Sequence, residues 1–305
     1  MSDFDLKAAT QEYATRLGDD SVVLGHRISE WTSNGPFLEE DIALSNVALD
    51  YIGRARMYYS YAAELAGNGK TEDDLAYTRD MREFRNLLIH ELPRGDFAYT
   101  MVRQLFVDVF NTHYLPELAK SSDSTLAGIA QKAIKETRYH LRRSHEWALR
   151  LGDGTAESHQ RMQRALESLW GYTHELFDAD PLETQLADAG VGVHNAALRP
   201  AWLEQVSAIL TEATLTVPKD DWAVRGGRIG YHTENLGHID RLRMGARRLR
   251  RHPGRHLDRS GSERLLQPLL VGGPAVTAKP QGAFPGAFLS LERAVCLDET
   301  AKSRS

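Results

Sequence analysis

The chain has 305 residues, of which 42% are hydrophobic and 26% charged, and this is the composition of a soluble globular protein. Its length is enough for one large domain or two small domains with a substantial core. The formal charge of −5 gives no reason to expect a nucleic-acid partner. The sequence shows no signal peptide and no apolar run of about 18 residues, so we expect no membrane span.

Charge is distributed unevenly along the chain. From Arg241 onward there are 13 Lys and Arg against 5 Asp and Glu, and seven of the sixteen residues from Arg241 to His256 are Arg. The remainder of this stretch is rich in Pro and Gly, a composition that does not bury a core. We therefore predict a helical domain over residues 1–240 and a basic tail over 241–305 that is disordered or aberrant. A frame-shifted or fused reading frame is our hypothesis for this tail.

Cysteine usage bears on the compartment. Cys296 is the only cysteine, so the chain cannot form an internal disulfide. Together with the missing signal peptide, this favours a cytoplasmic location.

The predicted elements follow one another as helices joined by short polar turns. We expect helices over residues 4–16, 21–31, 38–66, 71–91, 97–118, 126–152, 157–177 and 198–215, with a less regular stretch over 178–197. No run of alternating β-branched residues is long enough for a sheet. The sequence thus predicts an all-α fold, a bundle of about six to eight helices.

Two long helices have the clearest boundaries. The helix predicted over residues 38–66 has Glu39, Glu40 and Asp41 in its first turn, where their charges complement the helix dipole. A Gly-Asn-Gly turn follows the helix. Residues 126–152 carry apolar side chains near a 3.6-residue period, with Asp123 or Ser124 as the predicted N-cap.

The centre of the 126–152 helix resembles a metal-binding motif with altered spacing. Di-iron proteins of the four-helix type place Glu-x-x-His on two helices, because residues three apart share one face. Here Tyr139 stands three residues after Glu136, and His140 comes one residue later, turned by roughly 100°. The sequence contains no Glu-x-x-His and no Asp-x-x-His at all. We therefore expect no metal bound by this chain.

A set of ordered segments resembles the C subunit of the bacterial ring 1,2-phenylacetyl-CoA epoxidase. None is diagnostic alone, but together they cover about residues 12–238. The segments are residues 17–20, 24–31, 38–46, 75–80, 84–88, 135–141, 151–155, 175–178 and 230–237.

The resemblance implies a ferritin-like fold and a non-catalytic role. In this family the C subunit pairs with the catalytic di-iron subunit and holds it in its working shape. The complex is an NADPH-dependent monooxygenase of aerobic phenylacetate catabolism that epoxidises the ring of phenylacetyl-CoA. NADPH, FAD and an iron-sulfur cluster belong to its reductase subunit. The altered spacing at Glu136 and His140 agrees with a role that needs no metal in this chain.

The resemblance also implies two places that contact the CoA substrate. One matches Glu83-Phe84-Arg85-Asn86, where Arg85 departs from the family pattern but suits a CoA phosphate. The other matches Thr184-Gln185-Leu186, where only Leu186 fits the pattern well.

Polar residues of the helices predicted over 38–66 and 126–152 suggest a vestigial metal site. We interpret Asp50 and Arg54 as an ion pair that fills this site with Glu91 and Arg138, since a buried carboxylate without a metal needs such partners. Glu136 and His140 would be a leftover polar pair in the same place. The His232-Thr-Glu234 segment, part of the family pattern, is interpreted as structural.

Two other functions stay open at this point. One is a catalytic di-iron oxygenase that uses an unusual ligand set drawn from Asp50, Glu91, Glu136 and His140. The other is a free-standing acyl-CoA-binding bundle. Iron content and co-purification with a di-iron subunit would discriminate between these hypotheses.

Overall fold

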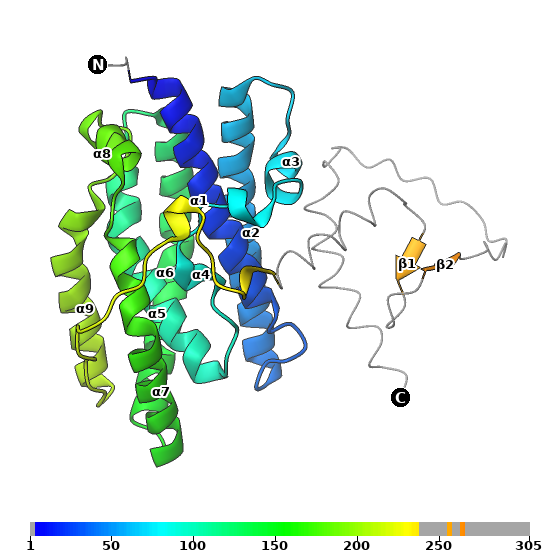
Figure 1. Cartoon of the computed structure of the whole chain (residues 1–305). Helices are drawn as coiled ribbons and strands as arrows, with labels where there is room; N and C mark the ends of the chain where they lie inside the picture. Colours follow the sequence, from blue (N-terminus) through cyan, green and yellow to red (C-terminus); the bar gives the residue numbers. More distant parts are fainter. Residues whose placement is uncertain (1–3, 238–254, 258–262, 266–305) are drawn as a thin grey trace.

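A computed structural model describes residues 4–237, 255–257 and 263–265, and the helical part forms an elongated bundle (Figure 1). The four long helices run side by side along the bundle. They are α1 (Leu6–Ser29), α2 (Leu38–Ala66), α5 (Phe97–Leu118) and α6 (Ser124–Gly152). Helices α7 (Ala156–Leu169) and α9 (Arg199–Glu212) pack against α5 and α6. The all-α prediction is confirmed, with a fold consistent with the ferritin-like bundle.

Shorter elements complete the described part of the chain. The α-helices are α3 (Glu72–Tyr77), α4 (Leu88–Glu91) and α8 (Pro181–Asp188). The 3₁₀ turns are η1 (Met81–Glu83), η2 (Trp170–Leu176), η3 (Asn195–Leu198) and η4 (Gly227–Ile229). These pieces bring the α-helices of the described residues to nine, slightly more than predicted, because the stretches 71–91 and 178–197 contain short helices.

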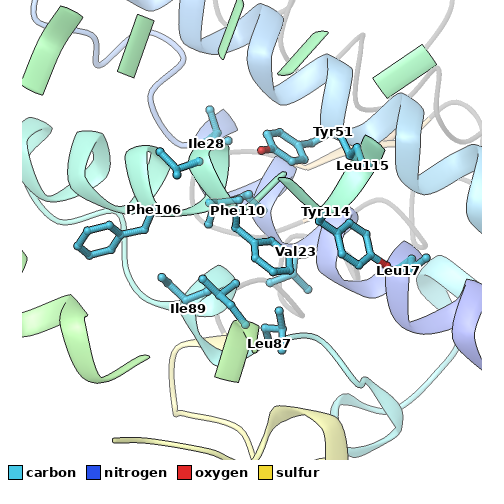
Figure 2. Packing of buried hydrophobic residues seen from close by; sticks show 14 of the residues in the cluster. Leu17, Val23, Ile28, Tyr51, Leu87, Ile89, Phe106, Phe110, Tyr114 and Leu115 are labelled. Atoms are coloured by element: carbon cyan, nitrogen blue, oxygen red, sulfur yellow. The ribbon is translucent and has the colours of Figure 1, made fainter. Parts of the chain in front are cut away.

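The core lies between the long helices. Side chains from α1, α2, α5 and the start of α4 point into one shared interior, where Phe110 lies near Val23 and Tyr114 near Leu17 (Figure 2). A hydrogen bond of 2.6 Å joins the hydroxyls of Tyr13 and Tyr114 and so connects α1 to α5. The burial of this apolar surface is the main force that holds the bundle together.

The predicted helix ends at α2 and α6 are confirmed. Gly67 closes α2 in the left-handed conformation, with φ at 59°, and its N–H donates to the Ala63 carbonyl. Asp123 caps α6 by accepting from the N–H groups of Thr125 and Leu126.

The prediction of two helices over 4–16 and 21–31 is wrong. The structure has the single helix α1, which continues through Gly18, Asp19 and Asp20. Gly18 lies inside the helix and serves packing, because its lack of a side chain admits the ring of Tyr59. A Cβ at Gly18 would lie 2.5 Å from that ring. The two aspartates do not cap a helix, because their carboxylates accept hydrogen bonds from other parts of the chain.

The prediction of one helix over 71–91 is also wrong. The chain forms α3, turns at η1, and runs extended to α4. Three buried or half-buried carboxylates hold the extended piece by accepting its backbone N–H groups. Asp19 accepts from Arg85, Asp20 from Leu87, and Glu175 from Leu88. These bonds replace the ones that a continuous helix would make.

The predicted tail lies mostly outside the described residues. Within it, residues 255–257 (β1) and 263–265 (β2) pair as a short antiparallel ribbon. No described helix is both long and apolar enough to cross a membrane.

Candidate functional site

An ion pair and a histidine–carboxylate contact connect α2 to α6 at the place predicted for a vestigial metal site. His140 Nε2 lies 2.9 Å from Asp50 Oδ2, and Arg54 Nη2 lies 3.4 Å from Glu136 Oε2. His140 and Arg54 are buried, whereas the Asp50 side chain is 37% exposed. The predicted pairing of Asp50 with Arg54 is therefore wrong, because each residue finds its partner on the neighbouring helix instead.

Aromatic and polar groups of α2, α5 and α6 extend this network inward. The Tyr51 ring stacks on His140 with 5.4 Å between the ring centroids, and the Arg54 guanidinium lies 4.9 Å from the centroid of the same tyrosine ring. Asp108 accepts from Ser144 Oγ at 2.8 Å and from the Tyr51 hydroxyl at 3.4 Å. Burial raises the pKa of Asp108, and the nearby His140 opposes this effect.

Glu91 and Arg138 lie outside this network, contrary to the prediction. Arg138 is exposed on α6. Glu91 is fully buried on α4, where Asn86 Nδ2 donates to it at 2.9 Å and His232 Nδ1 lies 2.7 Å away. The hypothetical iron-ligand set is thus divided between two separate networks.

The polar residues between α2 and α6 do not fit a dinuclear iron centre. The Arg54 guanidinium, a fixed positive charge, pairs with Glu136, which an iron ion would need as a ligand. Within residues 4–237, no three His, Cys, Asp or Glu side chains group as a metal site would require. The preference of iron for several carboxylate and imidazole ligands is not met by the arrangement.

A small cavity of about 50 Å³, with a mixed polar and apolar lining, lies in the bundle interior next to Arg54. Its lining includes Tyr13, Tyr51, Tyr58 and Tyr114, together with Asp20 and Arg228 at one end. A volume of this size accommodates a few water molecules but no CoA thioester.

Arg228 joins the two places that the resemblance assigned to CoA contact. Its guanidinium donates to Asp20 Oδ2 at 2.8 Å and to the backbone carbonyl of Arg85, and its Nε lies 3.1 Å from Glu183. The segments 83–86 and 184–186 are therefore connected through one buried cation. Sequence reasoning missed Asp20, Glu183 and Arg228, because more than forty residues separate each of them from the next and no local pattern relates them.

The residues predicted to contact CoA differ greatly in accessibility. Phe84, Asn86 and Leu186 are 0% exposed. The side chains at the surface are those of Glu83, Thr184 and Gln185, with Arg85 half-buried. Arg79 lies over the Phe84 ring at 4.2 Å. In this conformation only the four accessible residues could touch a ligand.

A glycine-containing segment lies against the backbone carbonyls of Phe84 and Asn86. We call residues 226–236 the strap. Glu175 Oε1 accepts from the N–H groups of Gly226 and Gly227 at 2.9 and 2.8 Å. Next to the strap is a surface cavity of about 270 Å³, which is lined by Met81, Arg82, Gly230, Tyr231, His232, Thr233 and Leu236.

Comparisons with known proteins agree on one family. A family model described as "Phenylacetic acid catabolic protein" matches residues 4–256. The chain is also 50% identical over 225 residues to the C subunit of 1,2-phenylacetyl-CoA epoxidase from Escherichia coli (strain K12). This alignment covers 74% of the chain and 90% of that relative.

Proposed function

The chain belongs to the family of phenylacetic acid catabolic proteins, and from this premise we propose that it is the non-catalytic structural subunit of a phenylacetyl-CoA epoxidase. The observation that carries the proposal is the 50% identity over 90% of the C subunit from E. coli. In this role the chain acts in phenylacetate catabolism, in the cytoplasm, as one subunit of an oxidoreductase complex.

The side-chain contacts between α2 and α6 support a role without a metal in this chain. Arg54 pairs with Glu136 and His140 contacts Asp50 across the bundle, so the buried Arg54 charge has a carboxylate partner. A buried charge needs such a partner, so these pairs keep the two helices at a fixed spacing without a metal ion. A rigid bundle of this kind is suited to support a neighbouring subunit.

The proposed partners are the catalytic di-iron subunit and the other subunits of the epoxidase. The reductase subunit would supply electrons from NADPH through FAD and an iron-sulfur cluster. Phenylacetyl-CoA would contact this chain through Glu83, Arg85, Thr184 and Gln185, the accessible members of the two predicted places. Arg85 offers a planar cation that suits a CoA phosphate.

The test combines co-expression with metal analysis. We expect the chain to co-purify with the di-iron subunit, and we expect the epoxidation of phenylacetyl-CoA to require both chains. Expressed alone in iron-replete medium, the chain should contain less than about a tenth of an iron atom. About two iron atoms per chain would instead support the catalytic hypothesis. Binding of acyl-CoA without any association with the di-iron subunit would support a free-standing binding bundle.

A further inference from the structure

We infer that the strap, residues 226–236, is a pH-sensitive lid over Phe84 and Asn86 and that His232 is its latch. The strap closes on the segment between η1 and α4 through contacts that come from four places in the fold. Arg228 donates to the Arg85 carbonyl, and Arg27 on α1 donates to the Asn235 carbonyl. Glu175 and Glu91 accept from further strap N–H groups, those of Gly226, Gly227 and Thr233.

Both ring nitrogens of His232 face an acceptor when the strap is closed. Nε2 lies 2.9 Å from the Phe84 backbone carbonyl, which can only accept. Nδ1 lies 2.7 Å from Glu91 Oε2, and this carboxylate also accepts from Asn86 and from the Thr233 N–H. A neutral imidazole donates through one nitrogen only, so the closed strap is the form that holds an imidazolium.

The charges that face His232 come from several elements. Glu91 on α4 is its partner, and Arg85 opposes its positive charge. Arg82 lines the same surface cavity, and Arg27 donates to the Glu91 backbone carbonyl. Burial alone would lower the pKa of His232, but the hydrogen bond and the charge of Glu91 outweigh it and raise the pKa above 6.5.

The raised pKa of His232 makes the closed strap more stable at low pH than at high pH. Closing the strap binds a proton at His232, so the closed form is favoured below pH 6.5, the ordinary pKa. The latch is lost progressively as the pH rises above that value and through the raised pKa of the closed form. We therefore expect the strap to open more readily as the pH rises above 6.5.

The strap is closely fitted against residues 82–86, where one buried acceptor lacks a partner. A Cβ on Gly227 would lie 2.0 Å from the Asn86 carbonyl oxygen, and Gly230 sits against Arg82 and Arg85 with φ at 81°. The Asn86 amide oxygen is buried without a hydrogen-bond partner among the described residues. A buried unsatisfied acceptor is costly, so an open form that exposes Asn86 recovers this loss.

A lid would explain why two residues of the predicted CoA contact are fully buried. Opening of the strap would free the backbone carbonyls of Phe84 and Asn86 beside Arg85, and this would extend the accessible surface that Glu83 and Arg85 already offer. The identity of the ligand rests on the proposed function, whereas the movement of the strap does not.

Hydrogen exchange of the full chain tests the movement directly. Between about pH 6 and about pH 8, protection of peptides from 81–92 and 226–236 should fall by up to roughly tenfold per pH unit between pH 6.5 and the raised pKa of the closed form, and level off above it, after correction for intrinsic exchange. In His232→Gln the same peptides should be weakly protected at both pH values. His194→Gln, which alters an exposed histidine, should behave as the wild type. Equal pH dependence in the wild type and His232→Gln would overturn the inference.

A second variant tests the lid without using titration. Gly227→Ala should hold the strap open at every pH, with at least roughly tenfold lower protection of the 81–92 peptides. Gly128→Ala on α6, where an added Cβ meets nothing within 4 Å, is the matched control. Unchanged protection in Gly227→Ala would overturn the lid.

Titration with phenylacetyl-CoA separates the two proposals. Tighter binding to Gly227→Ala than to the wild type supports both the lid and the CoA contact. An open strap without any phenylacetyl-CoA binding would leave the lid intact and contradict the CoA contact of the proposed function.

Discussion

Single buried carboxylates shape the irregular parts of this protein. Asp19 is 0% exposed and accepts from the Tyr59 hydroxyl at 2.6 Å, from Arg79, and from the Arg85 N–H at 2.8 Å. Glu175 likewise accepts from Leu88 and from the strap. Because each carboxylate satisfies several donors at once, its loss leaves several buried groups unpaired.

Asp19→Asn should strongly destabilise the protein. The amide cannot neutralise Arg79, which is largely buried over Phe84, and breaking a buried pair in this way costs about 3–5 kcal/mol. Urea denaturation followed by circular dichroism measures the change. Asp188→Asn, at a side chain that is 68% exposed, should change the free energy of unfolding by less than about 0.5 kcal/mol. A similar small change in Asp19→Asn would show that Asp19 is not a structural anchor.

At the scale of elements, the long helices α2, α5 and α6 were predictable, whereas the continuity of α1 and the break before α4 were not. Apolar periodicity and caps such as Asp123 are local signals, and they located α2, α5 and α6 correctly. Gly18 and the extended piece before α4 depend on contacts with distant residues, Tyr59 and Glu175. Local propensity carries no information on such partners. Gly18 was therefore interpreted as a helix end, and the extended piece before α4 as part of a helix.

Two glycines within long helices should respond oppositely to alanine. Gly18→Ala places a Cβ 2.5 Å from the buried Tyr59 ring, whose hydroxyl is fixed by Asp19, so we expect a loss of roughly 1–3 kcal/mol. Gly53→Ala on α2 meets nothing within 4 Å and should gain about 0.5–1 kcal/mol from helix propensity. Thermal unfolding of the isolated chain measures both changes. A stabilised Gly18→Ala would mean that Tyr59 can move aside.

For the whole molecule, the sequence indicated the α2–α6 site but not its pairing. Asp50, Arg54, Glu136 and His140 do lie together, because their spacing on two amphipathic helices turns them toward each other. Which residue pairs with which depends on the relative shift of the helices, which no spacing within one helix reveals. The position of Glu91 was predicted wrongly because its partner His232 lies 141 residues away in the sequence, and no local pattern relates the two residues.

The predicted division at residue 240 can be tested on the whole molecule. Every buried apolar residue of the described core lies between Ala9 and Leu236, and the strap ties the end of this region to α1 and α4. A chain that ends at residue 240 should therefore keep the free energy of unfolding of the full chain to within about 0.5 kcal/mol. It should also keep its co-purification with the di-iron subunit. A loss of more than about 1 kcal/mol would show that residues after 240 contribute to the fold, because changes outside a core do not reach that size. Unchanged stability with lost co-purification would instead assign residues 241–305 to the subunit interface.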